Sequence, residues 1–218
     1  KINLSLGKMP NDNEIILAVK RVYLFPTTAY FFTGFRPAGQ INYESIIEKN
    51  FLTLTHGSAT QNKSLKQPIA YVTIYNVTER KFFIYQRATE DKDYGEKGLQ
   101  GKLSLGFGGH MKPLDNKDGG GIRKSLIREI GEETGLTGML GDIKLLGYVN
   151  DESNDVNRIH FGMLYAARTD SLLISPKDPE IKKWELKTLK EIQKISKDPE
   201  CKLETWSRIA LEPLSELL

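Results

Sequence analysis

Short apolar runs alternate with polar stretches along the first third of the chain. Branched and aromatic residues dominate 14–20 and 29–35, a composition typical of buried strands. Isoleucines spaced along 40–50 give that stretch one apolar face and predict a short amphipathic helix. Residues 56–67 are polar and contain no apolar run, which indicates a linker.

The remaining pattern is first strongly β and then mostly helical. Strands are predicted at 69–75, 81–87, 142–150 and 159–168. One helix is predicted to end near Thr134, and two more are predicted near 188–196 and near 202–217. Strands followed by helices, without regular βαβ alternation, predict an α+β sandwich. We therefore expect a mixed α/β amino-terminal segment, residues 1–66, packed on a main domain, residues 67–218.

Composition and charge exclude some functional classes. The chain is 39% hydrophobic and 27% charged, so it can build a core in water. No apolar run reaches the roughly 20 residues of a membrane helix, and no signal-peptide pattern is present. The net charge of +3 is small, so we expect neither a membrane nor a nucleic-acid partner. The lone Cys201 fits a reducing compartment and predicts a cytoplasmic location.

One predicted helix carries three acidic side chains on the same face. Glu129, Glu132 and Glu133 stand at positions i, i+3 and i+4, which are neighbours on a helix surface. Such carboxylates repel one another by roughly 0.2–0.5 kcal/mol per pair. A bound hard cation such as Mg²⁺ would offset that repulsion, because it prefers oxygen ligands. The alternative is an ordinary solvated acidic face.

Glycines precede this helix in the sequence. Gly106, Gly108 and Gly109 cluster where a predicted strand ends, and the absence of side chains there permits close approach of the backbone. On its own this string predicts only a tight turn or a bulge. Facing an acidic helix, it can bring backbone carbonyls to a metal ion and amides to a phosphate. The two features together predict a site.

These residues resemble the box of the Nudix (MutT-type) hydrolase family, whose pattern is G-x5-E-x7-R-E-U-x-E-E-x-G-U, with U a bulky aliphatic residue. The run from Arg128 to Leu136 matches at every specified position. More loosely, the chain is similar to bacterial Nudix proteins described as predicted phosphoesterases, which share a Gly-Gly-His turn and a downstream His-Phe-Gly like 160–162. The resemblance covers roughly residues 67–200 and implies an α/β/α sandwich with a mixed sheet.

The first half of the box departs from the family pattern. Arg128 follows Gly109 by nineteen residues, five more than the pattern has, so five additional residues are expected within 116–120. Counting forward from Gly109 puts Asp115 in the place of the family's glutamate, whereas counting backward from Arg128 gives Gly120. The sequence leaves open whether Asp115 replaces that glutamate.

The resemblance implies that water attacks a phosphorus atom of a diphosphate linkage, with Mg²⁺ or Mn²⁺ as the cofactor. Carried over by position, the implied metal ligands are Glu129, Glu132, Glu133 and a backbone carbonyl of Gly108 or Gly109. Arg128 would orient a carboxylate.

A phosphate-binding arginine, a substrate-contacting histidine and a general base would complete the site. Arg87 ends a predicted strand and is a candidate to bind a phosphate oxygen, although it can equally be a surface arginine. His110 is a candidate for substrate contact. The general base varies within the family, so either a box glutamate such as Glu132 or Glu152, after the strand at 142–150, can serve. His160 is expected to be structural, and His56, in the polar stretch, is expected to lie at the surface.

Two other functions were considered. A non-catalytic nucleotide or metabolite sensor on the same fold would not need three converging carboxylates. Isoprenoid diphosphate isomerisation, found in Nudix relatives, calls for a cysteine near the metal, and Cys201 lies far from the box in a charged stretch. We therefore expect hydrolysis of a small-molecule diphosphate or nucleotide. The sequence leaves open the substrate and whether the protein forms a homodimer.

Overall fold

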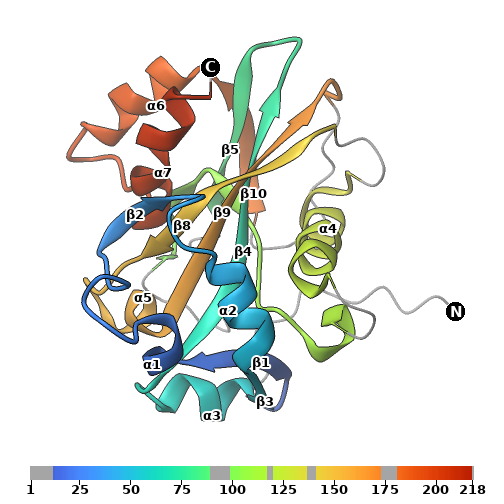
Figure 1. Cartoon of the computed structure of the whole chain (residues 1–218). Helices are drawn as coiled ribbons and strands as arrows, with labels where there is room; N and C mark the ends of the chain where they lie inside the picture. The colour runs from blue at the N-terminus through green and yellow to red at the C-terminus, as the bar shows by residue number, and fades with distance from the viewer. Residues whose placement is uncertain (1–11, 89–98, 117–119, 137–140, 173–180, 218) are drawn as a thin grey trace, which may run out of the picture.

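A mixed β-sheet lies between two helical layers in the computed structural model, which describes residues 12–88, 99–116, 120–136, 141–172 and 181–217. Helices α6 (Leu189–Ser196) and α7 (Thr205–Ser215) cover one face of the sheet (Figure 1). Helices α2 (Tyr43–Asn50) and α4 (Gly121–Thr134) cover the other. The predicted α+β sandwich with a mixed sheet is confirmed.

The remaining elements complete the sheet and its connections. The strands are β1 (Ile15–Lys20), β2 (Gly34–Pro37), β3 (Phe51–Thr55), β4 (Leu65–Asn76), β5 (Lys81–Arg87), β6 (Leu103–Ser104), β7 (Gly106–Phe107), β8 (Ile143–Asn150), β9 (His160–Thr169) and β10 (Ile181–Lys187). The short helices are α1 (Arg21–Leu24), α3 (His56–Gln61) and α5 (Asp155–Ile159), and Pro113–Asn116 forms a 3-10 helix.

Strand β4 is the centre of the sheet, whose order is β10-β5-β4-β9-β8-β2. Its pairing with β9 is parallel over ten residue pairs, whereas the pairings of β4 with β5 and of β8 with β9 are antiparallel. Strand β1 pairs with the start of β4 through Val19 and Lys66, and with β3 on its other side. The amino-terminal segment thus contacts the main sheet through a shared strand.

Alternation along β4 builds a core on each face of the sheet. Ala70, Val72 and Ile74 point toward α4 and α2, whereas Ile69 and Tyr71 point toward α7. Because side chains of a strand alternate between faces, a strand that is covered on both sides must be apolar at nearly every position. This explains why β4 is buried along its whole length.

The expected linker at 56–67 is wrong. Residues 56–61 form α3, capped at its start by the Thr55 hydroxyl, which accepts from the Ser58 amide at 3.3 Å. The polar stretch then enters β4 at Leu65. Polar residues are typical of loops, but they also occupy short caps and the exposed side of a helix, which explains the difference.

Two strand predictions also need correction. Within 29–35 only the last two residues belong to a strand, β2, and Phe31 is exposed. Strand β10 was not predicted, because its middle carries two lysines and Trp184, whose side chains are exposed at the edge of the sheet. Residues 89–98, between β5 and β6, lie outside the described residues.

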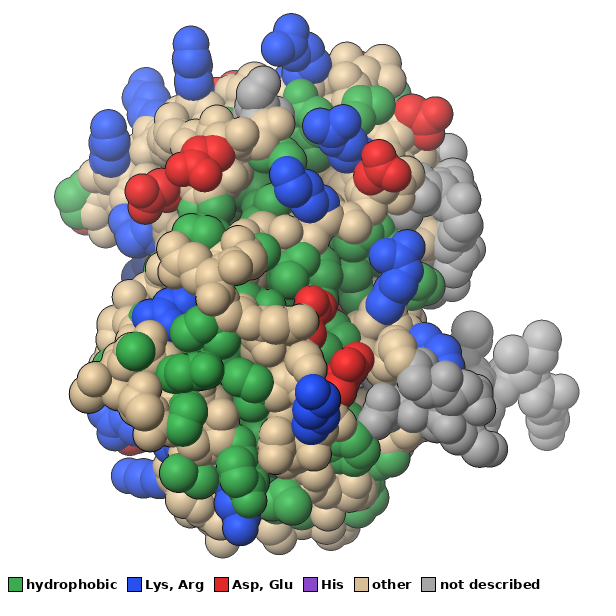
Figure 2. All heavy atoms as spheres, in the orientation of Figure 1, with side chains coloured by type: hydrophobic (Ala, Val, Ile, Leu, Met, Phe, Trp, Pro, Cys, Tyr) green, Lys and Arg blue, Asp and Glu red, His purple; other side chains and the backbone are tan. Residues whose placement is uncertain are grey.

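Apolar side chains also reach the surface. In the space-filling view they gather over the lower left of the molecule, where α1 and the segment after it lie (Figure 2), and Val22, Tyr23 and Phe31 are exposed there. In the part of the chain that the structure describes, no helix has the length and apolar character to cross a membrane.

Candidate active site

Helix α4 presents its three glutamates at different depths. Glu129 is buried, Glu133 is half-buried, and the Glu132 side chain is 57% exposed. The helix ends where Gly135 adopts a left-handed conformation, with φ of 72°, and its amide donates to the Gly131 carbonyl at 3.1 Å. The acidic face therefore runs from the protein interior to solvent and stops sharply at its carboxyl end.

Arg128 contacts two of these carboxylates. Its Nη1 donates to Glu129 Oε1 at 2.5 Å and to Glu132 Oε2 at 3.2 Å. Its Nη2 lies 3.4 Å from the His110 carbonyl oxygen and from Ser125 Oγ. The guanidinium thus connects the glutamate face to the glycine turn, the segment 106–110. This placement suits the orienting role predicted for Arg128, which stays a prediction.

The glycine turn lies directly against α4. The Gly108 amide donates to Glu133 Oε2 at 3.1 Å. A Cβ on Gly109 would come within 2.8 Å of the Glu129 carboxylate, and one on Gly108, whose φ is 149°, would come within 1.9 Å of the Ala70 carbonyl oxygen. Only glycine fits at position 108, where the clash is with backbone, whereas a side chain at position 109 would require the Glu129 carboxylate to shift. The fold therefore brings Gly108 and Gly109 to two of the predicted metal ligands.

The donor set at this contact fits a hard divalent cation. Burial raises the pKa of Glu129 above its ordinary value. The positive charge of Arg128 and its hydrogen bond lower this pKa, whereas the negative charge of Glu132 raises it. A bound cation would stabilise the charged form of Glu129. Carboxylate and carbonyl oxygens are also the ligands that Mg²⁺ prefers. Among the described residues, however, no three His, Cys, Asp or Glu side chains are already arranged around a metal position. Backbone oxygen or water would have to complete the set.

Asp115 lies in the 3-10 helix Pro113–Asn116, and its side chain is outside the described part of the structure. Of the stretch expected to hold the additional residues, 117–119 lie outside it as well. The question whether Asp115 replaces the glutamate of the box therefore stays open.

Arg87 is held by a carboxylate that sequence reasoning missed. Its Nε forms a short hydrogen bond with Glu204 Oε1, and its guanidinium lies over the Tyr85 ring, 5.6 Å from the ring centre. Burial raises the pKa of Tyr85, while the charges of Arg87 and Glu133 act on it in opposite directions. Arg87 and Glu133 therefore lie near the same buried ring. No local pattern around Glu204 could have indicated this contact.

His110 is the last residue of the glycine turn and contacts another histidine. Its Nε2 lies 3.2 Å from Nε2 of His160. Burial, together with His160, His56 and Lys112, holds the pKa of His110 well below 6.5. His110 is therefore neutral at physiological pH, and its ring lies next to Gly109.

Glu152 is paired with three cations, of which Arg158 lies farthest away, with its Nε 3.8 Å from Glu152 Oε2. Its Oε1 lies 2.9 Å from Arg21 Nη2 and 3.0 Å from Nζ of Lys66, a fully buried lysine. Burial opposes ionisation of Glu152, but the hydrogen bonds from Arg21 and Lys66 leave its pKa below the ordinary value. A paired carboxylate of low pKa accepts a proton poorly. Lys66 stands in a polar stretch of the sequence, so no local signal pointed to this cluster.

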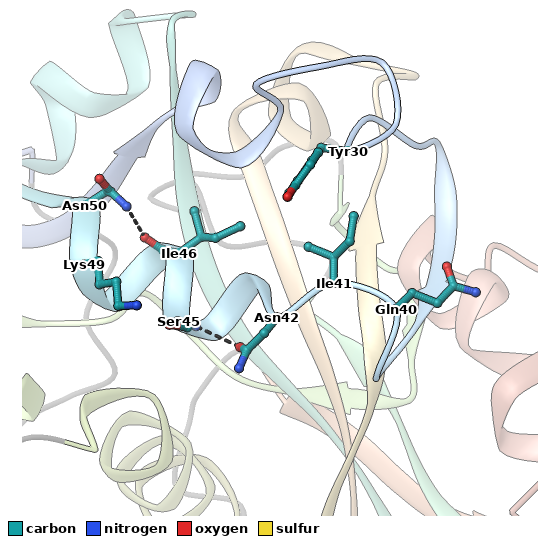
Figure 3. A pocket seen from close by; sticks show the side chains of 8 residues that line it. All are labelled: Tyr30, Gln40, Ile41, Asn42, Ser45, Ile46, Lys49 and Asn50. Atoms are coloured by element: carbon teal, nitrogen blue, oxygen red, sulfur yellow. Dashed lines mark hydrogen bonds between the residues drawn. The ribbon is translucent and has the colours of Figure 1, made fainter.

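A pocket of about 410 Å³ lies elsewhere, beside α2. Figure 3 shows Tyr30 and Ile41 across from the helix, with Asn42 and Lys49 among the polar residues that line it. The Asn42 side chain is used to cap α2, accepting from the Ser45 amide at 2.9 Å. None of the predicted site residues lines this pocket.

Comparisons with known proteins identify the family of the chain. The family model described as "NUDIX domain" matches residues 65–205. Protein YmaB of Bacillus subtilis (strain 168) is 30% identical over 217 residues, covering 96% of this chain and 100% of that protein.

Solved structures share the fold. The crystal structure of Tm1382, a protein proposed to be a Nudix hydrolase, matches with a TM-score of 0.76 and 26% identity, covering 94% of this chain and 100% of that one. The NUDIX domain of Shewanella oneidensis NrtR, solved with ADP ribose, matches with a TM-score of 0.53 and 14% identity, covering 70% of this chain and 88% of that one. With the family model spanning well over half of it, the chain belongs to the Nudix family of hydrolases, enzymes that act on phosphoric anhydrides.

Proposed function

We propose that the protein hydrolyses the pyrophosphate bond of a nucleoside-diphosphate-linked or similar diphosphate, and that hydrolysis requires Mg²⁺ or Mn²⁺. The observation that carries this proposal is the contact between the glycine turn and α4. A buried carboxylate, Glu129, lies against the Gly109 backbone, so close that a Cβ at position 109 would come within 2.8 Å of it. Nudix hydrolases generally use divalent metals.

The residues of α4 and the turn supply the oxygen ligands in this proposal. Glu129, Glu132 and Glu133, with a carbonyl of Gly108 or Gly109, would hold the cation. When bound, a divalent cation neutralises phosphate charge and promotes attack by water. Arg128 keeps two of the carboxylates in place through its hydrogen bonds.

The proton acceptor is best assigned to Glu132. Its side chain is the most exposed of the three glutamates, so attacking water can reach it. Glu152 was the other candidate, and its ion pairs with Arg21 and Lys66 argue against it. Arg87 would bind a phosphate oxygen, because the fork of its guanidinium matches that geometry, and His110 would contact another part of the substrate.

The test is a screen of diphosphate compounds, comprising nucleoside triphosphates, dinucleotides, nucleotide sugars and ADP-ribose, scored by the phosphate products released. We expect turnover with Mg²⁺ or Mn²⁺ and a loss of at least about 100-fold in excess chelator, because carboxylates alone cannot stabilise a phosphoryl transition state. Full activity in excess chelator would contradict the metal requirement. Tight binding of a nucleotide without any turnover would instead favour the sensor alternative.

A further inference from the structure

The three histidines of the chain lie in one row. The ring centres of His56 and His110 are 4.9 Å apart, and those of His110 and His160 are 5.3 Å apart. They come from α3, the glycine turn and the start of β9, so a hundred residues separate the outer two. His56 lies outside the residues 65–205 that match the family model.

Hydrogen bonds fix which nitrogen of each ring carries its proton. His160 Nδ1 lies 2.8 Å from the Val156 carbonyl oxygen, which can only accept, so Nδ1 is the donor. A neutral His160 then accepts at Nε2, and the partner 3.2 Å away, Nε2 of His110, must donate. His110 is left with an unprotonated Nδ1.

The amino-terminal segment holds the far end of the glycine turn. The Leu17 amide donates to the Met111 carbonyl at 2.8 Å, and Lys112 Nζ lies 2.9 Å from Glu14 Oε1. Residues 111 and 112 directly follow His110, so β1 and the residue before it fix the backbone on the carboxyl side of the turn.

His56 contacts His110 through the surface of its ring. Its ring meets His110 edge-on, at an interplanar angle of 67°. Its Nε2 lies 3.3 Å from Thr60 Oγ1, and among the described residues its buried Nδ1 has no hydrogen-bond partner. The Nδ1 atom lies 3.9 Å from Asp12 Oδ1, which is too far for a hydrogen bond.

We propose that His56 is a positioning residue of the active site. Its ring and the hydrogen bond to His160 hold the His110 imidazole beside the glycine turn from two sides, so the amino-terminal segment completes the site of the Nudix domain. The kinetic consequence rests on the proposed diphosphate hydrolysis, whereas the placement of the rings does not.

Kinetics of the full chain with two substitutions test the role of the ring. His56→Ala removes it and should lower kcat/KM by at least about tenfold, whereas His56→Phe keeps the edge contact and should stay within about threefold of the unsubstituted protein. Thr60→Ala keeps the His56 ring but removes the hydroxyl near its Nε2, which also accepts from Gln67 Nε2 at 3.2 Å, and kcat/KM of this control should stay within about threefold of the unsubstituted protein. Equal kinetics of the Ala and Phe variants, each measured on folded protein, would overturn the proposal.

The proton positions give a readout that needs no substrate. Imidazole ¹⁵N spectra of a chain with three histidines contain three assignable patterns. We expect a proton on Nδ1 of His160 and on Nε2 of His110, in the unsubstituted protein and in His56→Phe, and mixed forms for His110 in His56→Ala. A proton on His110 Nδ1 in the unsubstituted protein would overturn the arrangement. If no diphosphate is hydrolysed at all, the proposed function fails, while these spectra still decide the ring placement.

Discussion

Glu129, Glu132 and Glu133 share one face of α4, and the first is buried. Changing each to Gln keeps its size and removes its charge. We expect each change to lower turnover by about 100-fold or more, because a lost charge at a metal ligand is felt in the transition state. Metal-free stability should rise by less than about 1 kcal/mol, since repulsion between neighbours is relieved. Kinetics and metal-free melting measure both effects.

The matched comparison for these variants is Asp115→Asn. It removes an acid of the same region that lies outside α4, so it should matter much less. Unchanged turnover in all three glutamine variants would refute the catalytic assignment and leave α4 with an ordinary acidic surface.

Lys66 makes stability depend on pH. Its side chain is fully buried, and burial, only partly offset by Glu152, lowers its pKa from 10.5 to about 8. Between these values the unfolded chain binds more protons than the folded one, so the free energy of unfolding should rise by about 2 kcal/mol from pH 8 to pH 10 on account of this group. Urea unfolding across that range, compared with Lys66→Met, isolates the contribution. Identical pH dependence of the two proteins would show that Lys66 is not perturbed.

At the scale of elements, α7 connects to the site through the residue that precedes it. Glu204 is 4% exposed, its amide donates to the Leu103 carbonyl at 2.9 Å, and its carboxylate holds Arg87. We expect Glu204→Gln to raise KM for a diphosphate by about tenfold with little change in kcat, because Arg87 loses its orientation but the metal ligands do not. Arg87→Ala should raise KM further.

The control for that measurement is Glu200→Gln, an exposed acid of the same stretch, which should leave KM unchanged. An unaltered KM in Glu204→Gln, with a raised KM in Arg87→Ala, would show that Arg87 does not need Glu204 to bind phosphate.

Elements were predictable where local pattern and tertiary environment agree. Strand β5 was predicted with its observed bounds, and α4 ends at Thr134 as predicted, because Gly135 provides a local stop signal. The stretch 56–67 resembles a linker because α3 exposes polar residues, and because Lys66 and Gln67 are polar although β4 buries them. Strand β10 was missed because an edge strand needs neither apolar faces nor alternation.

The same division holds for the candidate site. The glutamates and the glycines lie within one local motif, so their types and spacing could be read from the sequence. Arg87–Glu204 and Arg21–Glu152 join residues 117 and 131 positions apart, and no local rule connects them. The histidine row is of the same kind, since only the pairing of β1 and β9 with β4 brings its members together.

At the scale of the whole molecule, the boundary expected between residues 66 and 67 falls inside β4. Lys66 pairs with Val19 of β1, and Gln67 pairs with His160 of β9. Leu17, Val19 and Tyr43 from the amino-terminal segment belong to the same buried cluster as Leu126 and Ile130 of α4. Such continuity of strand and core predicts that the two parts unfold together.

That cooperativity gives the last prediction, that residues 1–66 pack on the domain in solution. Leu17→Ala should lower the free energy of unfolding of the whole protein by about 2–4 kcal/mol, because it leaves a cavity in the shared core. Val22→Ala, at a side chain that is 62% exposed, is the control and should change it by less than about 0.5 kcal/mol. We expect a single unfolding transition and resistance of this segment to limited proteolysis. Rapid release of the segment, leaving a stable and soluble remainder, would show instead that the apolar runs of β1 and α2 are not needed to close the core.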